Sequence, residues 1–376
     1  MSQEVQNPPP ERRFAEELAW LAAWDRGRRP PGWRLSPRAV VAFVCGGALR
    51  LDAPVDGLPE ERTIAPKFVG DRALVERAVI TLAGERGLLL VGEPGTAKSM
   101  LSELIAAAVC GTSALVVQGT AGTAEEHLRY GWDYAALLAR GPSAEALVPS
   151  PVLEAMQRGA IARVEEVTRC LPEVQDALVS ILSDRRMAVP ELGEAGAVEA
   201  RPGFNVIATA NLRDRGVSEM SAALKRRFNF ENVPPIPTLE AELELVRGRA
   251  VAALERSGAP PAVDEQLLRL LVTAFRDLRG GRSVEGWAVE RPSTVMSTAE
   301  AVGVATAIGL HAAFLGDASG VALLPSHLLG VVLKDDPKDR GRLLAYWDGA
   351  VRRRAEVDAA WKALHERRGE LEEGLG

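Results

Sequence analysis

The clearest chemical pattern lies at positions 91–100, which read VGEPGTAKSM. Gly92, Lys98 and Ser99 match the spacing G-x-x-x-x-G-K-[ST] of a phosphate-binding loop. In such a loop, backbone N–H groups at a helix start and the helix dipole attract phosphate oxygens. Lys98 would reach the β- and γ-phosphates, and Ser99 would bind Mg²⁺. The pattern predicts a nucleotide site made of Gly92, Glu93, Pro94, Gly95, Thr96, Ala97, Lys98, Ser99 and Met100.

Ala97 departs from this pattern, which has a second glycine at that position. Alanine keeps the backbone N–H group and adds one methyl group. If residue 97 has a negative φ, that methyl group carries little conformational cost. We therefore expect the loop to tolerate the exchange.

Short apolar runs precede the loop and recur after it. Residues 87–91, GLLLV, form a continuous apolar run, which is typical of a strand buried on both faces. The segments 113–119 and 204–210 are similar, and 160–164 is a weaker case because Arg163 interrupts it. Helical stretches separate these runs. They predict an α/β fold with a parallel sheet and helices on both faces.

The pattern divides the chain into three predicted parts. Residues 1–62 are expected to form an N-terminal helical extension and linker, and residues 63–236 the α/β nucleotide-binding core. From 237 to 376 no strand signal survives, and apolar residues recur at helical spacing. We therefore predict an all-α C-terminal domain that ends in an amphipathic helix.

Smaller features complete this expectation. One helix is predicted from Glu11 and a second over 39–49, followed by a proline-containing linker over 52–66. Residues 187–203 are predicted to form a hairpin with its turn near 194–196.

Composition narrows the function classes. The net charge is −6, which argues against a general nucleic-acid binder. The three cysteines are scattered, which fits a reducing cytoplasm, and the four histidines form no pair at metal-ligand spacing. The N-terminus lacks the apolar core of a signal peptide. The apolar run 301–316 carries His311 and falls short of a membrane span, so we expect a buried helix there.

The loop GEPGTAKS, with FVGD upstream, resembles the MoxR branch of the AAA+ ATPases. That branch commonly has alanine before the lysine, and the resemblance covers roughly residues 60–310. It implies an AAA+ core followed by a helical lid, with ATP and Mg²⁺ as cofactors. The preference for adenine comes from the resemblance alone.

The stretch 159–182, GAIARVEEVTRCLPEVQDALVSIL, resembles the family's second motif, an apolar strand that ends in Asp-Glu. The resemblance places Glu165 where an aspartate coordinates Mg²⁺ through water, and Glu166 where a glutamate activates the attacking water. The sequence departs from the family by having glutamate first and Arg163 within the strand. A longer carboxylate can still reach a water-bridged cation, with looser geometry.

Three further positions follow from the resemblance. FNVIATAN places Asn211 beside the γ-phosphate, where its amide would orient the water. ALKRRFNF places Arg227 where an arginine reaches the γ-phosphate of the neighbouring subunit, with Arg226 as the adjacent candidate. The lid helix of the family usually starts with an arginine. Ala299 stands there, and Arg291 could substitute.

The resemblance implies a ring, expected to be a hexamer, that hydrolyses ATP and remodels a client protein in the cytoplasm. Such proteins often act with a von Willebrand factor A-domain partner. The family carries an insertion that matches residues 128–151 and faces the centre of the ring. Its Trp132 and Tyr134 could grip a partner polypeptide, or could equally pack as a small cluster.

Two other function classes stay open. One is a non-hydrolysing nucleotide-dependent scaffold, which Glu165 and Ala299 would suit. The other is an NTPase motor acting on nucleic acid. It would need a basic stripe, and the core offers only the arginines at 213, 215, 226 and 227.

Overall fold

The structure is a computed structural model that describes residues 7–211, 217–316, 320–334 and 336–373. Contacts between Cα atoms divide the chain into two compact units. The first contains residues 1–93 and 97–234, and the second contains 94–96 and 235–376. Each unit is described separately below.

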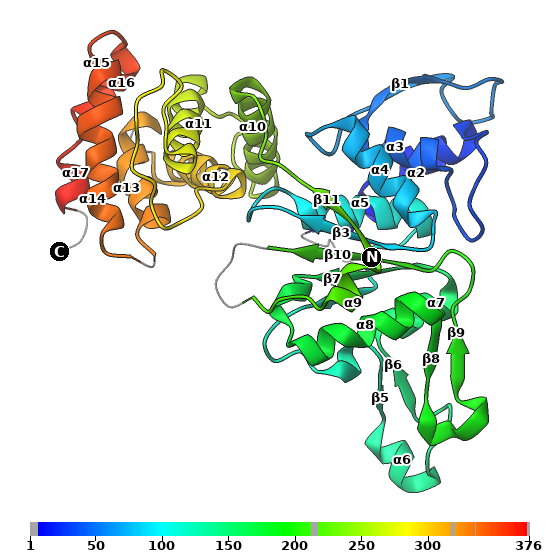
Figure 1. Ribbon diagram of the computed structural model, residues 1–376. Helices are drawn as coiled ribbons and strands as arrows, with labels where there is room; N and C mark the ends of the chain where they lie inside the picture. Colours follow the sequence, from blue (N-terminus) through cyan, green and yellow to red (C-terminus); the bar gives the residue numbers. More distant parts are fainter. Residues whose placement is uncertain (1–6, 212–216, 317–319, 335, 374–376) are drawn as a thin grey trace. The chain divides into compact units, whose positions relative to one another are not determined.

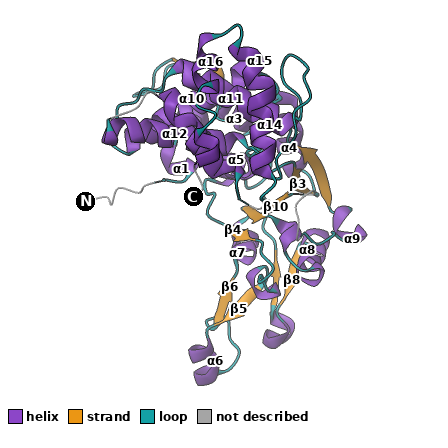
Figure 2. Ribbon diagram, turned by 90° about the vertical axis from the view of Figure 1, so that its left-hand side faces the viewer, coloured by secondary structure: helices purple, strands orange, loops and turns teal. Residues whose placement is uncertain are grey.

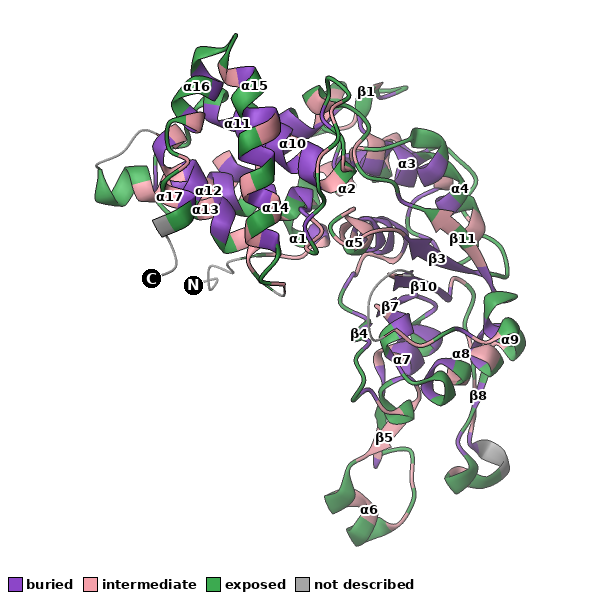
Figure 3. Ribbon diagram, turned by 60° about the vertical axis from the view of Figure 1, so that its left-hand side comes forward, coloured by how far each residue is buried: buried purple, intermediate pink, exposed green. Residues whose placement is uncertain are grey.

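A five-stranded parallel sheet forms the centre of the first unit (Figure 1). Its order is β11-β3-β10-β7-β4. The strands are β3 Gly87–Val91, β4 Val116–Gln118, β7 Ile161–Glu165, β10 Asn205–Ala210 and β11 Phe228–Asn232. All residues of β3, β7 and β10 are buried, which confirms the predicted parallel sheet (Figure 3). The edge strand β11 was not predicted, because its buried and exposed residues are mixed.

Alternate residues of these strands face two different hydrophobic cores. Leu88 and Leu90 of β3 pack with helices that precede and follow that strand, α4 Arg72–Leu82 and α5 Lys98–Cys110. Leu89 packs on the opposite face. The helices of that second core are α7 Pro151–Arg158, α8 Pro172–Asp184 and the short α9 Ala222–Lys225. Helices therefore cover both faces of the sheet, and the predicted α/β fold is confirmed.

The N-terminal residues belong to the same compact unit. They form α1 Pro10–Arg13, α2 Ala15–Trp24 and α3 Pro37–Cys45, followed by β1 Gly47–Arg50 and β2 Glu61–Ile64. Trp20 of α2 and Phe43 of α3 are fully buried in the core that contains Leu88. The predicted second helix is wrong at its end: Gly46, with φ 74°, terminates α3, and the next residues pair with β2. The expected linker therefore contains a strand.

Two antiparallel strand pairs extend from the sheet (Figure 1). The first joins β5 Tyr130–Trp132 to β6 Leu147–Pro149, with α6 Tyr134–Arg140 between them. The second joins β8 Arg186–Ala188 to β9 Ala197–Glu199, which confirms the predicted hairpin. The two pairs are linked. The Tyr130 hydroxyl donates to the Glu191 carboxylate over 2.8 Å, and Arg129 donates to the Ala188 carbonyl oxygen over 2.8 Å.

The second unit is helical in its described part, apart from an isolated bridge between Arg282 and Ala288 (Figure 2). Its main helices are α10 Leu239–Arg256, α11 Glu265–Gly280, α12 Thr298–Leu315 and α13 Gly320–Val332. A continuous helical run follows, comprising α14 Asp339–Tyr346, the π-helix η4 Trp347–Val351 and α15 Arg352–Ala355. The chain ends with α16 Ala359–His365 and α17 Glu370–Glu373. This agrees with the predicted all-α C-terminal segment. The expectation of one amphipathic helix at its end is wrong, because α16 and α17 are separate helices.

Helix α12 is longer than the apolar run seen in the sequence, because it starts at Thr298. It is long and apolar enough to cross a membrane by length and composition alone, contrary to our expectation, and 28% of it is buried. Core helices of globular proteins pass the same test, so one such helix is weak evidence for a membrane. The expected burial holds for the face that carries Ala301 and Ile308, whereas Phe314 and Leu315 are exposed.

Candidate nucleotide-binding site

Three segments predicted to carry chemistry lie at one edge of the central sheet. The loop follows β3, Glu165 is the last residue of β7, and Asn211 follows β10. These strands are parallel neighbours, and Val91 pairs with Ala210. Their carboxyl ends therefore meet, which is where open α/β sheets bind ligands.

Ala97 immediately precedes helix α5 and has φ 65° and ψ 26°. This conformation is left-handed, so the expectation that its methyl group costs little is wrong. The Cβ atom of an L-residue lies too close to the following carbonyl oxygen there, at a cost of about 1–2 kcal/mol. Gly95, with φ 77°, adopts a positive φ in the same loop without that cost.

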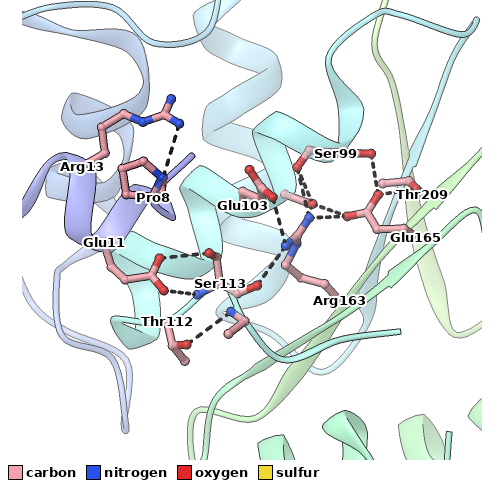
Figure 4. A network of polar contacts seen from close by, with 12 residues as sticks. Pro8, Glu11, Arg13, Ser99, Glu103, Thr112, Ser113, Arg163, Glu165 and Thr209 are labelled. Atoms are coloured by element: carbon pink, nitrogen blue, oxygen red, sulfur yellow. Dashed lines mark hydrogen bonds and ion pairs between the residues drawn. The ribbon is translucent and has the colours of Figure 1, made fainter. Parts of the chain in front are cut away.

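The Glu165 carboxylate lies at the centre of a buried polar cluster (Figure 4). Its Oε2 atom accepts hydrogen bonds from the hydroxyls of Ser99 and Thr209, each over 2.7 Å. Its Oε1 atom accepts from the Ser102 hydroxyl over 2.6 Å and from Arg163 Nη2 over 2.7 Å. Both carboxylate oxygens are therefore held in fixed directions, beside the first turn of α5.

The same contacts keep Glu165 ionised. Burial acts to raise the pKa of this carboxyl group, but the charge of Arg163 and the three hydroxyl donors outweigh it, so the pKa of Glu165 is lowered. The cluster therefore presents a negative carboxylate together with two serine hydroxyls and one threonine hydroxyl. Hard oxygen donors of this kind are the ligands that Mg²⁺ prefers. The residues present fit such an ion.

Lys98 is directed into its own loop. Its ammonium group donates to the carbonyl oxygens of Gly92 over 3.0 Å and Glu93 over 2.7 Å. Burial lowers the pKa of Lys98, although the carboxylates of Glu166, Glu165 and Glu93 oppose this shift. An incompletely solvated ammonium group at a helix start is well suited to bind phosphate.

Glu166 adopts a strained backbone conformation at the end of β7, with φ 52°. Its N–H group donates to the Thr209 hydroxyl over 2.9 Å, and that hydroxyl donates in turn to Glu165. Its carboxylate is 2.6 Å from Arg169 Nε, and 42% of its side chain is exposed. The two adjacent glutamates therefore differ: the Glu165 carboxylate is buried and fully hydrogen-bonded, whereas the Glu166 carboxylate is accessible.

Sequence reasoning missed three residues of this cluster. Ser102 lies one helical turn after Ser99 on α5, and Arg163 lies two residues before Glu165 on the same face of β7. Both spacings could have identified them. Thr209 comes from another strand, and only the pairing of β10 with β7 brings it close.

Comparison with known proteins identifies the family. Residues 87–228 match the AAA domain of the dynein-related subfamily, and residues 240–372 match the YehL-like AAA+ ATPase C-terminal domain. The uncharacterized protein YehL of Escherichia coli strain K12 is 47% identical over 369 residues, which span 98% of each chain. This chain belongs to the YehL family of AAA+ ATPases.

Further matches show lower identity or cover less of the chain. The uncharacterized protein SH1500 of Staphylococcus haemolyticus is 33% identical over 144 residues, or 38% of this chain and 53% of that one. Among solved structures, NtrX from Brucella abortus in complex with ADP has a TM-score of 0.49 and 14% identity, with 81% of this chain and 66% of that chain covered. NtrX in complex with ATP has a TM-score of 0.47 and 16% identity, with 80% and 67% covered.

In this YehL family member the two candidate arginines lie at the other edge of the sheet. Arg227 directly precedes β11, and its carbonyl oxygen accepts from the N–H group of Gly87 at the start of β3. Its Nε atom donates to the Ser183 hydroxyl over 2.8 Å. The Arg226 side chain is exposed. Neither arginine is brought to the loop of its own chain.

The remaining expected positions are placed as follows in this YehL family member. Asn211 is half-buried, directly after β10. Ala299 lies exposed in the first turn of α12, and Arg291 is exposed in the preceding segment. The arginines at 213 and 215 lie outside the described residues.

Two histidines of this YehL family member that are distant in sequence lie close together in the structure. The rings of His311 on α12 and His327 on α13 have centroids 6.2 Å apart. Within the described part of the chain, however, no three His, Cys, Asp or Glu side chains gather where they could hold a metal ion.

Proposed function

We propose that this protein hydrolyses ATP in the presence of Mg²⁺, and that it does so as a ring of the MoxR type, expected to be a hexamer. The observation that carries the proposal is the convergence of Ser99, Glu165 and Thr209 beside the loop that contains Lys98. Membership of an AAA+ family supports it. Ring assembly rests on the resemblance to the MoxR branch and on the position of Arg227.

The roles of the residues follow from this arrangement. The backbone N–H groups of the loop and of the first turn of α5 would bind the phosphates, and Lys98 would exchange its two carbonyl partners for phosphate oxygens. Ser99 and Glu165 would hold Mg²⁺, which would neutralise charge on the phosphates.

Glu166 is proposed as the general base, because its carboxylate is accessible while that of Glu165 is fully bonded. It would accept the proton of the attacking water, and this requires release from Arg169. The Asn211 amide would orient the same water. Arg227 would act on the γ-phosphate of a neighbouring subunit.

A client polypeptide is the proposed target of remodelling, with a von Willebrand factor A-domain protein as the proposed partner. The insertion supports a contact with protein, because Tyr134, Leu138 and Val148 expose 70%, 89% and 50% of their surface. A hollow of about 510 Å³ lies beside it, lined by Val116 of β4 and Trp132 of β5 among others. Trp132 is half-buried, so one part of its side chain packs within the insertion while the exposed part is accessible to a client.

Turnover measured across protein concentration tests the chemistry and the assembly together. We expect ATPase activity per chain to fall on dilution, because the proposed active site needs a neighbour. Lys98→Ala removes a charge-assisted contact worth about 1.5–3 kcal/mol and should weaken ATP binding at least about tenfold. Equal ATP affinity in Lys98→Ala and wild type would contradict the loop assignment.

The same measurement separates the other function classes. Tight ATP binding without turnover at any concentration would support a nucleotide-dependent scaffold, the alternative that Glu165 and Ala299 would suit. Salt-dependent DNA binding that stimulates turnover would support a nucleic-acid motor instead.

A further inference from the structure

Arg163 is a buried cation in a central strand. It exposes 4% of its surface, and it interrupts the otherwise apolar part of β7. Its guanidinium group donates through Nε to the Ser102 hydroxyl over 2.9 Å and through Nη1 to the Ser113 carbonyl oxygen over 2.9 Å. Nη2 donates to Glu165 Oε1 over 2.7 Å and to the Ser99 carbonyl oxygen over 3.3 Å. Every nitrogen of the guanidinium group therefore has a partner.

The two carboxylate oxygens of Glu165 have different hydrogen-bond partners, and Arg163 binds only one of them (Figure 4). Oε1 is taken by Arg163 and Ser102, which leaves Oε2 directed at the hydroxyls of Ser99 and Thr209. A glutamate has one more rotatable bond than an aspartate, so its carboxylate has more positions to choose from. The arginine removes that freedom, because its planar fork fixes one oxygen and hence the direction of the other.

Burial makes the two side chains depend on each other. Removing one partner of a buried ion pair leaves an uncompensated charge and is strongly unfavourable. Glu103 also lies 3.5 Å from Arg163, but 42% of its side chain is exposed, so it cannot replace the buried partner. Arg163 and Glu165 therefore form one unit across two residues of a strand.

We propose that Arg163 is a positioning residue that fixes Glu165 for Mg²⁺, and that the pair together performs the role expected of a single shorter carboxylate. This inference rests on the proposed function. The support extends to the N-terminal helix α1. The Glu11 carboxylate accepts from the Ser113 N–H group over 3.1 Å and from the Ser113 hydroxyl over 2.9 Å, while the Ser113 carbonyl oxygen holds Arg163.

The test measures the affinity of a fluorescent ATP analogue with Mg²⁺ and with EDTA, and takes the ratio of the two. Arg163→Met keeps an unbranched apolar stem that ends near the position of Nε, and it removes the fork. This variant should lower the ratio by about 10–100-fold, which is the usual effect of losing a residue that orients a metal ligand. The affinity for the analogue in EDTA should change little. Glu103→Gln is the matched control and should leave the ratio unchanged. Glu11→Gln should lower it by a smaller factor than Arg163→Met.

A coupled exchange keeps the test decisive if Arg163→Met fails to fold. Glu165→Asp alone should lower the ratio, because the shorter carboxylate cannot reach Arg163 and Ser99 together. Arg163→Val combined with Glu165→Asp replaces the pair by a single shorter carboxylate, whose charge Mg²⁺ itself would compensate. This double variant should restore the ratio above that of Glu165→Asp alone. A double variant no better than Glu165→Asp, or a folded Arg163→Met with the wild-type ratio, would overturn the inference. Absence of any ATP binding by the wild type would overturn the proposed function, and this inference with it.

Discussion

At the scale of single residues, Ala97 stores strain directly at the candidate site. Its φ of 65° is unfavourable for alanine and free of cost for glycine. Ala97→Gly should therefore stabilise the protein, by up to about 1 kcal/mol after the greater flexibility of glycine in the unfolded chain is subtracted. A thermal unfolding scan would show this as a rise of about 2–4 °C.

The matched control for this prediction is Ala177→Gly in the middle of helix α8. Glycine in a helix costs about 1 kcal/mol relative to alanine, so this variant should lower the unfolding temperature. Opposite signs for the two exchanges are expected. A lower unfolding temperature for Ala97→Gly would mean that the loop is not left-handed at this residue.

Glu166 is the second residue whose role can be isolated. Glu166→Gln keeps the shape of the side chain but cannot accept a proton, so ATP binding should persist while turnover falls by about 10²–10⁴-fold. Calorimetric binding and a phosphate-release assay on the same sample would check both parts. Turnover at the wild-type rate would place the base at another residue.

At the scale of elements, Arg354 of α15 ties the helices of the second unit together. It donates to Asp277 of α11 over 2.7 Å and to both oxygens of Glu285 over 2.8 and 2.6 Å, and it lies 4.6 Å from the ring centroid of Trp361 on α16. The hydrogen bond from Arg354 is the main reason that the pKa of Glu285 is lowered to about 2.

This lowered pKa predicts the pH dependence of the contact. Because the folded pKa lies below its ordinary value of 4.5, the contact stabilises the protein above about pH 4.5 and is lost as the pH falls towards about 2. Glu285→Gln should therefore lower the unfolding temperature at neutral pH. The difference in unfolding temperature between this variant and the wild type should shrink as the pH falls from about 4.5 towards about 2. The effect should be modest, since 40% of the Glu285 side chain is exposed.

Glu290→Gln is the control, because Glu290 is an exposed carboxylate on the same connecting segment with no ion pair among the described residues. It should leave the unfolding temperature nearly unchanged both at neutral pH and at about pH 3. A Glu285→Gln deficit that stays constant down to about pH 3 would contradict the assigned ion pair.

At the scale of the whole molecule, the sheet separates the loop from Arg227 of the same chain. β11 runs parallel to β3 from Phe228 beside Gly87 to Asn232 beside Val91, so Arg227 precedes one end and the loop follows the other. At about 3.3 Å per residue this separation exceeds about 15 Å. Arg227 therefore lies too far from the loop of its own chain to serve it. We propose that it serves the nucleotide of a neighbouring subunit, where such an arginine is worth about 10³–10⁵ in rate.

Mixing two inactive variants tests this prediction. Arg227→Ala should bind ATP and hydrolyse it poorly, and Lys98→Ala should fail to bind ATP. A mixture should regain activity, because an intact arginine of one chain meets an intact loop of the other. Arg226→Ala serves as the control, with nearly normal turnover. A mixture no more active than either parent, with subunit exchange shown by native mass spectrometry, would contradict the role in a neighbouring subunit.

The sequence by itself predicted the central strands of the sheet and the helical C-terminal part, and it pointed to Lys98, Ser99 and Glu165 as chemical groups of the candidate site. Continuous apolar runs such as GLLLV predict buried parallel strands, because only such strands lose water on both faces. The loop spacing placed Lys98 and Ser99 at a helix start, and the order of strand and motif placed Glu165 at a carboxyl edge. These features depend on neighbours within a few residues, so local patterns carry them.

Only the tertiary structure decided how these groups are held. The sign of φ at Ala97 depends on how the loop joins strand to helix, and the pattern of residue types does not encode it. Arg163 weakened the strand prediction, yet the fold surrounds it with Ser102, Ser113 and Glu165 and makes the strand possible. Thr209 reaches Glu165 from another strand. Burial of a charge is decided by partners distant in sequence, and only the packed sheet brings those partners together.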